Sequence, residues 1–131
     1  MIERYSPDDP REWLSRARTN LALAKSALPD VHLEELCFNA HQAAEKAMKG
    51  VLIKRGQEFP YTHDLDRLLT LLSRVSSVPD VIWGARDLTP FAFGMRYPSR
   101  MTVSEQEYTR LVATADAVLH WAEGIILGAQ A

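Results

Sequence analysis

The sequence contains a single cysteine, Cys37, among 131 residues. One cysteine cannot form an internal disulfide, and it cannot supply the cysteine ligands of a zinc site. The four histidines are His32, His41, His63 and His120, and no two of them have the spacing of a zinc motif on one helix face. We therefore expect no disulfide, no resident metal and no other cofactor.

Long apolar runs and a strong net charge are also missing. No stretch approaches the ~18 apolar residues of a membrane-spanning helix. Residues 1–13 lack the apolar segment of a secretory signal. The formal net charge is only -2, so no overall attraction to nucleic acid or anionic lipid is expected, and any basic surface must be local. These absences predict a cytoplasmic protein without a membrane partner.

The overall composition is that of an ordinary globular protein. Hydrophobic residues make up 47% of the chain and charged residues 24%, which excludes a disordered tail or a fibrous repeat. A chain of 131 residues is the size of one domain. We expect residues 1–131 to form that single domain.

Apolar residues recur at helical spacing along almost the whole chain. The first predicted helix begins at Asp8 or Asp9, with Pro10 at its first position, and ends at residues 29–30. Its apolar stripe consists of Trp13, Ala17, Leu21, Ala24 and Leu28. The second predicted helix covers residues 32–55 and has a flat face of small residues, which lets neighbouring helices approach closely. This face includes Ala40, Ala43, Ala44 and Ala47. We expect it to pack against the stripe of the first or of the last helix.

Three further segments complete the helical pattern. The third helix is predicted to follow Thr62 as its N-cap, and the fourth to begin near residues 79–80 and to kink or break at Pro90. The last helix opens at Ser104, which forms a capping box with Glu107. No segment has the pattern of a strand. The sequence thus predicts an all-α fold, an up-down four-helix bundle with an extra short or kinked helix.

Candidate binding residues are mainly basic. The sequence has neither a nucleophile elbow nor a glycine-rich phosphate loop, and Cys37 is expected to be a small core residue. Four cations lie between Glu45 and Glu58 with no acid among them: Lys46, Lys49, Lys54 and Arg55. They form either part of a phosphate site or a solvated helix end.

Two other positions could contact a ligand. Arg96 and Tyr97, in the irregular segment before Pro98, offer a bidentate donor and a stacking face. Alternatively, Arg96 caps a broken helix end while Tyr97 packs. His63 opens the third helix, where it could act as a base, an RNA contact or a loop anchor.

Several segments together resemble HEPN domains, the higher-eukaryote and prokaryote nucleotide-binding domains. The main match is residues 36–49, LCFNAHQAAEKAMK, which is similar to the second helix of that family. Residues 59–65, 88–92 and 96–98 follow in the same order, and residues 13–17 fit as well. The resemblance covers nearly the whole chain and implies an HEPN-like bundle of four to five helices.

The resemblance also implies function and partners. Such domains are commonly homodimers that pair with a minimal nucleotidyltransferase. Many belong to toxin–antitoxin pairs, in which the HEPN protein is a metal-independent ribonuclease. That activity depends on an arginine, four to six residues, and then a histidine. Here the positions that follow Arg96 at this spacing are Met101, Thr102 and Val103, and none of them is a histidine. Seven residues separate Arg55 from His63, which is one more than the motif has.

The leading hypothesis is therefore a binding module with little or no catalysis. It would bind a nucleotide or an RNA phosphate and dock against a nucleotidyltransferase. The predicted contacts are Lys46, Lys49, His63, Arg96 and Tyr97. Gln42 and Glu45 could instead form a polar seam between helices. The alternatives are a ribonuclease toxin, in which His63 acts with Arg55 or Arg96, and a purely structural dimer.

Overall fold

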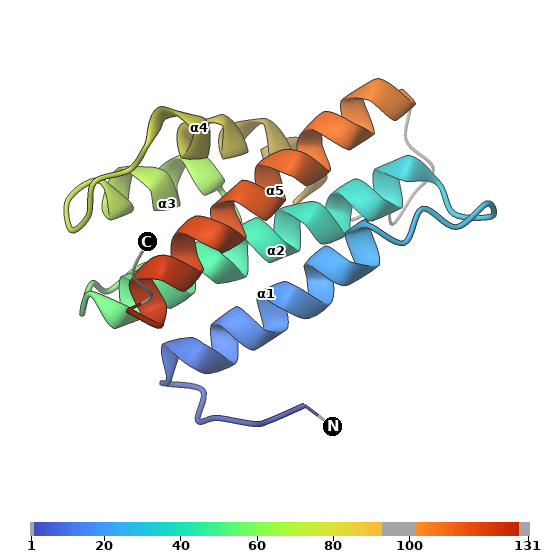
Figure 1. Ribbon diagram of the computed structural model, residues 1–131. Helices are drawn as coiled ribbons and strands as arrows, with labels where there is room; N and C mark the ends of the chain where they lie inside the picture. The colour runs from blue at the N-terminus through green and yellow to red at the C-terminus, as the bar shows by residue number, and fades with distance from the viewer. Residues whose placement is uncertain (1, 93–101, 129–131) are drawn as a thin grey trace.

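The structure is a computed structural model that describes residues 2–92 and 102–128 (Figure 1). The described residues contain helices and no strand, which confirms the all-α prediction. In chain order the elements are α1 (Pro10–Ala24), α2 (Leu33–Lys54), α3 (Leu65–Leu72), α4 (Asp80–Trp83), the 3₁₀ helix η1 (Gly84–Phe91) and α5 (Glu105–Ile126).

Helix α2 lies at the centre of the bundle, and α1 and α5 pack along it (Figure 1). α1 is antiparallel to α2, since Pro10 and Trp13 approach Gly50 near the end of α2, whereas Asn20 bonds to Asn39 near its beginning. The segment α4–η1 covers a third side and contacts both α2 and α5, with α3 beside it. The chain therefore runs up and down through α1, α2, α4–η1 and α5, with α3 as the extra short helix.

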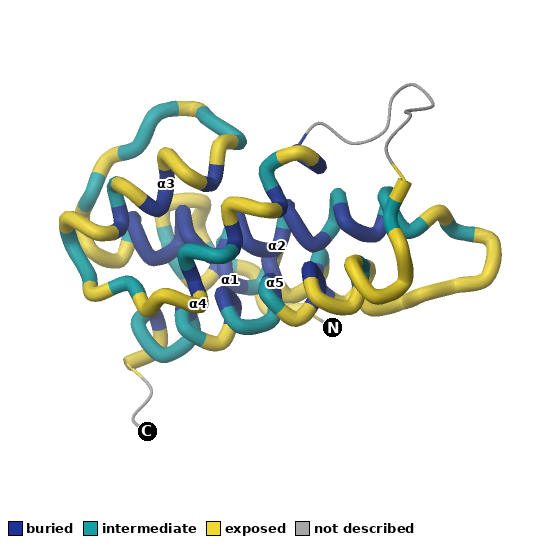
Figure 2. The backbone as a smooth tube through the Cα atoms, turned by 90° about the horizontal axis from the view of Figure 1, so that it is seen from above, coloured by how far each residue is buried: buried dark blue, intermediate teal, exposed yellow. Residues whose placement is uncertain are grey.

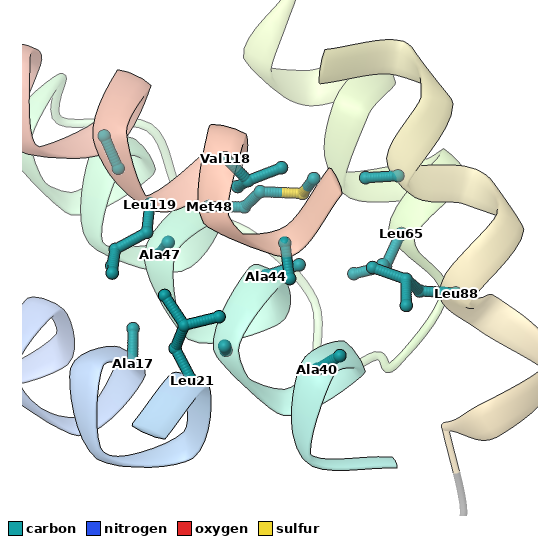
Figure 3. Packing of buried hydrophobic residues seen from close by; sticks show 14 of the residues in the cluster. Ala17, Leu21, Ala40, Ala44, Ala47, Met48, Leu65, Leu88, Val118 and Leu119 are labelled. Carbon is teal, nitrogen blue, oxygen red and sulfur yellow. The ribbon is translucent and has the colours of Figure 1, made fainter. Parts of the chain in front are cut away.

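The alanine-rich face of α2 is the centre of the core. Ala40, Ala44 and Ala47 are fully buried and are met by larger side chains from every neighbouring element. Figure 3 shows these neighbours, among them Leu21, Leu65, Leu88, Val118 and Leu119. Small residues on one helix and large ones on its neighbours allow close packing without voids. Buried residues accordingly recur along the length of α2 (Figure 2). The alanine-rich face of α2 therefore packs against the apolar stripes of both α1 and α5.

Two predicted boundaries were wrong. α1 ends at Ala24, because the chain turns at Ala27 with a φ of 46°, and Leu28 is exposed rather than buried. The third helix begins at Leu65, and its N-cap is Asp64, whose side chain accepts the Asp66 N–H at 3.0 Å. Aspartate is at least as good an N-cap as threonine, and Asp64 lies only two residues after the predicted cap, Thr62.

The fourth helix is irregular for a different reason than predicted. Its α-helical part ends at Trp83, seven residues before Pro90, and the chain continues as a 3₁₀ helix through Pro90 to Phe91. Pro90 has no N–H to donate in a 3₁₀ helix either, and the helix ends one residue after it. The start of α5 is as predicted, since Ser104 Oγ accepts the Glu107 N–H at 3.0 Å.

Candidate functional site

A buried ion pair lies within α2. Glu45 and Lys49 are one helical turn apart and are only 4% and 5% exposed. Lys49 Nζ donates to Glu45 Oε2 at 2.9 Å. Moving two charges out of water costs several kcal/mol for each ion before their attraction is counted. A charged pair on a helix that otherwise faces the core with alanines therefore marks this turn of α2 as a candidate functional position.

The second oxygen of Glu45 orients a histidine on another element. His63 belongs to the loop between α2 and α3, and its Nδ1 lies 2.8 Å from Glu45 Oε1. A carboxylate only accepts hydrogen bonds, so the His63 Nδ1 carries the proton in this contact. The His63 side chain remains partly exposed, whereas Glu45 is buried. Glu45 thus holds an imidazole at the surface with one oxygen and a lysine in the interior with the other.

A second histidine fixes the backbone of the same loop. His41 is fully buried, and its Nε2 lies 2.9 Å from the carbonyl oxygen of His63. Its other ring nitrogen is 3.3 Å from Gln42 Oε1. Burial lowers the pKa of His41, while its bond to the His63 carbonyl and the Glu45 charge oppose that shift. A neutral His41 that donates from Nε2 satisfies the His63 carbonyl, and its Nδ1 is then an acceptor.

Aromatic side chains cover the outer side of the ion pair. Lys49 Nζ lies 5.8 Å from the ring centroids of both Phe59 and Tyr61, within cation–π range. The Tyr61 ring meets the His63 ring edge-on at 5.3 Å. Tyr61 is 90% exposed, so a large aromatic face is held next to an oriented imidazole at the surface. Exposed aromatics of this kind stack on unpaired bases in RNA-binding proteins.

We call Glu45, Lys49, Tyr61 and His63 the α2–loop seam. Glu45 is central to this seam, which joins α2 to a loop rather than to another helix, and Gln42 lies outside it, next to His41. Tyr61 was not singled out from the sequence as a contact residue. Its position in a proline-containing loop beside His63 was the available signal, but only the fold shows that its ring is exposed.

The predicted contact residues lie in different places. Lys49 and His63 meet at Glu45. Lys46 extends toward α1, where its Nζ donates to Asn20 Oδ1 at 2.7 Å. Arg55 is the exposed C-cap of α2, and the His63 ring contacts Glu45 rather than Arg55. Arg96 and Tyr97 lie outside the described residues, so the structure does not place them.

The proposed solvated helix end is correct only for the final residues of α2. Lys54 and Arg55 are exposed, whereas Lys49 is buried and paired. In the part of the chain that the structure describes, no group of three or more histidine, cysteine or acidic side chains is arranged to hold a metal ion. No described helix is both long and apolar enough to cross a membrane.

With the fold and this polar turn described, comparison with family models shows that residues 10–125 match the HEPN domain. The chain belongs to the HEPN domain family. Comparison with curated proteins finds no match.

Two solved structures share the fold. An archaeal HEPN homologue, ST0689, is 25% identical, with a TM-score of 0.70 over 90% of this chain and 98% of that one. The protein TT1696 from Thermus thermophilus is 30% identical, with a TM-score of 0.57 over 90% of this chain and 93% of that one.

Proposed function

We propose that the chain is a single-domain HEPN binding module that holds a phosphate group of a nucleotide or an RNA at the α2–loop seam. One observation carries the proposal. A buried carboxylate, Glu45, is neutralised by Lys49 and holds the His63 ring at the surface beside the exposed Tyr61. Core packing does not explain this arrangement, because a buried ion pair adds little or nothing to the stability of the fold compared with apolar residues of similar volume.

The chemistry of the seam suits a nucleotide. Glu45 orients the His63 ring at the surface beside the Tyr61 ring, and charge-assisted hydrogen bonds to a phosphate are the strong ones. Tyr61 supplies a stacking face for a base. Lys46, three residues before Lys49, extends the positive charge toward α1. Arg96 and Tyr97 would add a guanidinium and a second aromatic ring, as the sequence resemblance suggests.

We propose two protein partners as well. Membership in the HEPN family supports a homodimer and a pairing with a minimal nucleotidyltransferase, as in a toxin–antitoxin-like system. The binding module would then present a nucleotide or an RNA end to its partner. We place this assembly in the cytoplasm, where both RNA and nucleotides are available.

Fluorescence anisotropy with a labelled single-stranded RNA tests the binding proposal. We expect Tyr61→Leu to weaken binding about tenfold, because base–aromatic stacking contributes ~1–3 kcal/mol. Tyr61→Phe should retain the affinity. His63→Gln should weaken binding, whereas His120→Gln, which changes an exposed histidine on α5, serves as the matched control. Unchanged affinity in both Tyr61→Leu and His63→Gln would exclude the seam as the binding site.

A metal-independent ribonuclease is the second candidate. One observation favours it, since a histidine oriented by a buried carboxylate is an arrangement that general bases use. Incubation with tRNA and mRNA, with and without a chelator, separates the two functions. The binding module leaves the RNA intact under both conditions. Cleavage that persists with chelator and disappears in His63→Gln would establish the ribonuclease instead. If the protein neither binds nor cleaves RNA, the remaining function is that of a structural dimer.

A further inference from the structure

A second concave site lies between the N-terminal residues 2–7 and the adjoining faces of α1 and α2. It consists of two neighbouring hollows, of ≈ 340 Å³ and ≈ 270 Å³. Four side chains line both hollows: Arg4, Glu12, Arg16 and Lys46. We call this region the arm hollow. Apart from Lys46, none of its residues was predicted from the sequence to contact a ligand.

The charges of the arm hollow do not balance. Three of the four shared side chains are basic, and Glu12 is the only acid among them. Both of its oxygens are already occupied, Oε1 by the Tyr5 N–H at 3.0 Å and Oε2 by Arg16 Nε at 2.7 Å. Glu12 therefore fixes the N-terminal arm and the Arg16 guanidinium and leaves an excess of positive charge in a concave surface.

Donor groups remain available in this hollow. Arg16 uses Nε for Glu12, and its two terminal amino groups have no hydrogen-bond partner within residues 2–92 and 102–128. Lys46 gives one hydrogen bond to Asn20. Burial lowers the pKa of Lys46; the Glu45 charge opposes this, and the nearby Arg16 and Lys49 cations lower it further. A bound anion would relieve the repulsion among these cations.

We propose that the arm hollow is a second anion site, which binds the phosphate of a small phosphate ester through Arg16, Lys46 and Arg4. Guanidinium groups match the geometry of phosphate oxygens, and charge-assisted bonds to them are strong. Tyr5 and Trp13 line the larger hollow and provide apolar walls for the organic part of the ligand. The volume of each hollow lies close to the lower end of the ~300–1,000 Å³ range of small-molecule pockets. This size favours a small ester over an RNA strand.

This site does not depend on the α2–loop seam. The seam uses Lys49, whose ammonium contacts Glu45, Phe59 and Tyr61, whereas the ammonium of Lys46 contacts Asn20 of α1. Lys46 is the side chain that both proposals use. Either proposal can still fail while the other stands, because Arg16 belongs only to the arm hollow and Tyr61 only to the seam.

Isothermal titration calorimetry with ribose 5-phosphate, adenosine 5′-monophosphate, inorganic phosphate and adenosine tests this proposal. We expect both esters to bind, with affinity that falls as salt rises, and adenosine not to bind. A response to inorganic phosphate equal to that of the esters would show that the site reads the phosphate alone and would overturn the role of Tyr5 and Trp13. Absence of binding by both esters would overturn the whole proposal.

Matched variants place the ligand. Arg16→Gln and Lys46→Gln should each weaken ester binding about tenfold, since each removes a charge-assisted bond. Arg110→Gln is the control, because Arg110 is 53% exposed and paired with Asp87, much as Arg16 is 57% exposed and paired with Glu12. Tyr61→Leu should leave the binding of ribose 5-phosphate unchanged, because this ester has no base to stack on the Tyr61 ring. If Tyr61→Leu abolishes it while Arg16→Gln and Lys46→Gln do not, the ester binds at the seam and the proposed arm site is wrong. If the Arg16 and Lys46 variants lose only RNA binding, the hollow is part of an RNA surface instead.

Discussion

The Glu45 carboxylate connects structure and proposed function at the scale of single residues. It is the common acceptor for Lys49 and His63, so its removal would leave Lys49 as an uncompensated buried charge. We expect Glu45→Leu alone to lower the free energy of unfolding by about 3–5 kcal/mol. The double variant Glu45→Leu, Lys49→Met should recover most of that loss, because apolar side chains of similar volume replace the pair. Thermal or urea unfolding followed by circular dichroism measures both.

The double variant also separates folding from function. If the ion pair exists to orient His63, the double variant is stable but binds RNA less tightly than the natural protein. A double variant that folds and binds normally would show that the pair has no role in binding.

The pH dependence of stability depends in part on His41. Burial lowers the pKa of His41 below its ordinary value of 6.5. The unfolded state therefore takes up this proton more readily than the folded state as the pH falls. Neutral His41 makes its full contribution to the free energy of unfolding at pH values above its pKa in the unfolded state. This contribution is lost as the pH falls from about 6.5 toward the lower pKa of the folded state. We expect the unfolding free energy to decline below about pH 6.5 more steeply than in His41→Gln. Parallel curves for the two proteins would contradict this account.

At the scale of the elements, the alanine face of α2 determines how closely the helices pack. Ala44 is fully buried between α1, α5 and the shorter helices. We expect Ala44→Leu to destabilise the fold by about 1–3 kcal/mol through overpacking. Ala22→Leu on the exposed side of α1 adds the same atoms without crowding and is the control. Equal melting temperatures for the two variants would mean that the face is not a core surface.

The helices were largely predictable because their signals are local. Pro10 at the start of α1, the alanine face of α2 and the Ser104 cap of α5 are all patterns within a few residues. The end of α1 was missed because Leu28 continues the apolar spacing, while the turn at Ala27 is not encoded by a glycine or a proline. The seam could be predicted only in part. Glu45 and Lys49 are one turn apart in the sequence, but the contact between Glu45 and His63 joins positions 18 residues apart and requires the folded loop.

At the scale of the whole molecule, the proposed function includes a homodimer. We expect light scattering at tens of micromolar to give a mass close to twice the 14.8 kDa of one chain, because interfaces of standard size usually hold in that range. A mass of one chain across that range would remove the dimer from the proposal, while the binding sites on each chain would stand.

In the proposed function RNA or nucleotide contacts the α2–loop seam, and a nuclear magnetic resonance titration tests this contact most directly. Addition of a short single-stranded RNA to isotope-labelled protein should shift the amide signals of residues 59–65 and of the turn of α2 that carries Glu45 and Lys49. Rising salt should reverse these shifts, because the contact involves phosphate charge. Shifts confined to other surfaces, or none at RNA concentrations that saturate binding by anisotropy, would contradict the account.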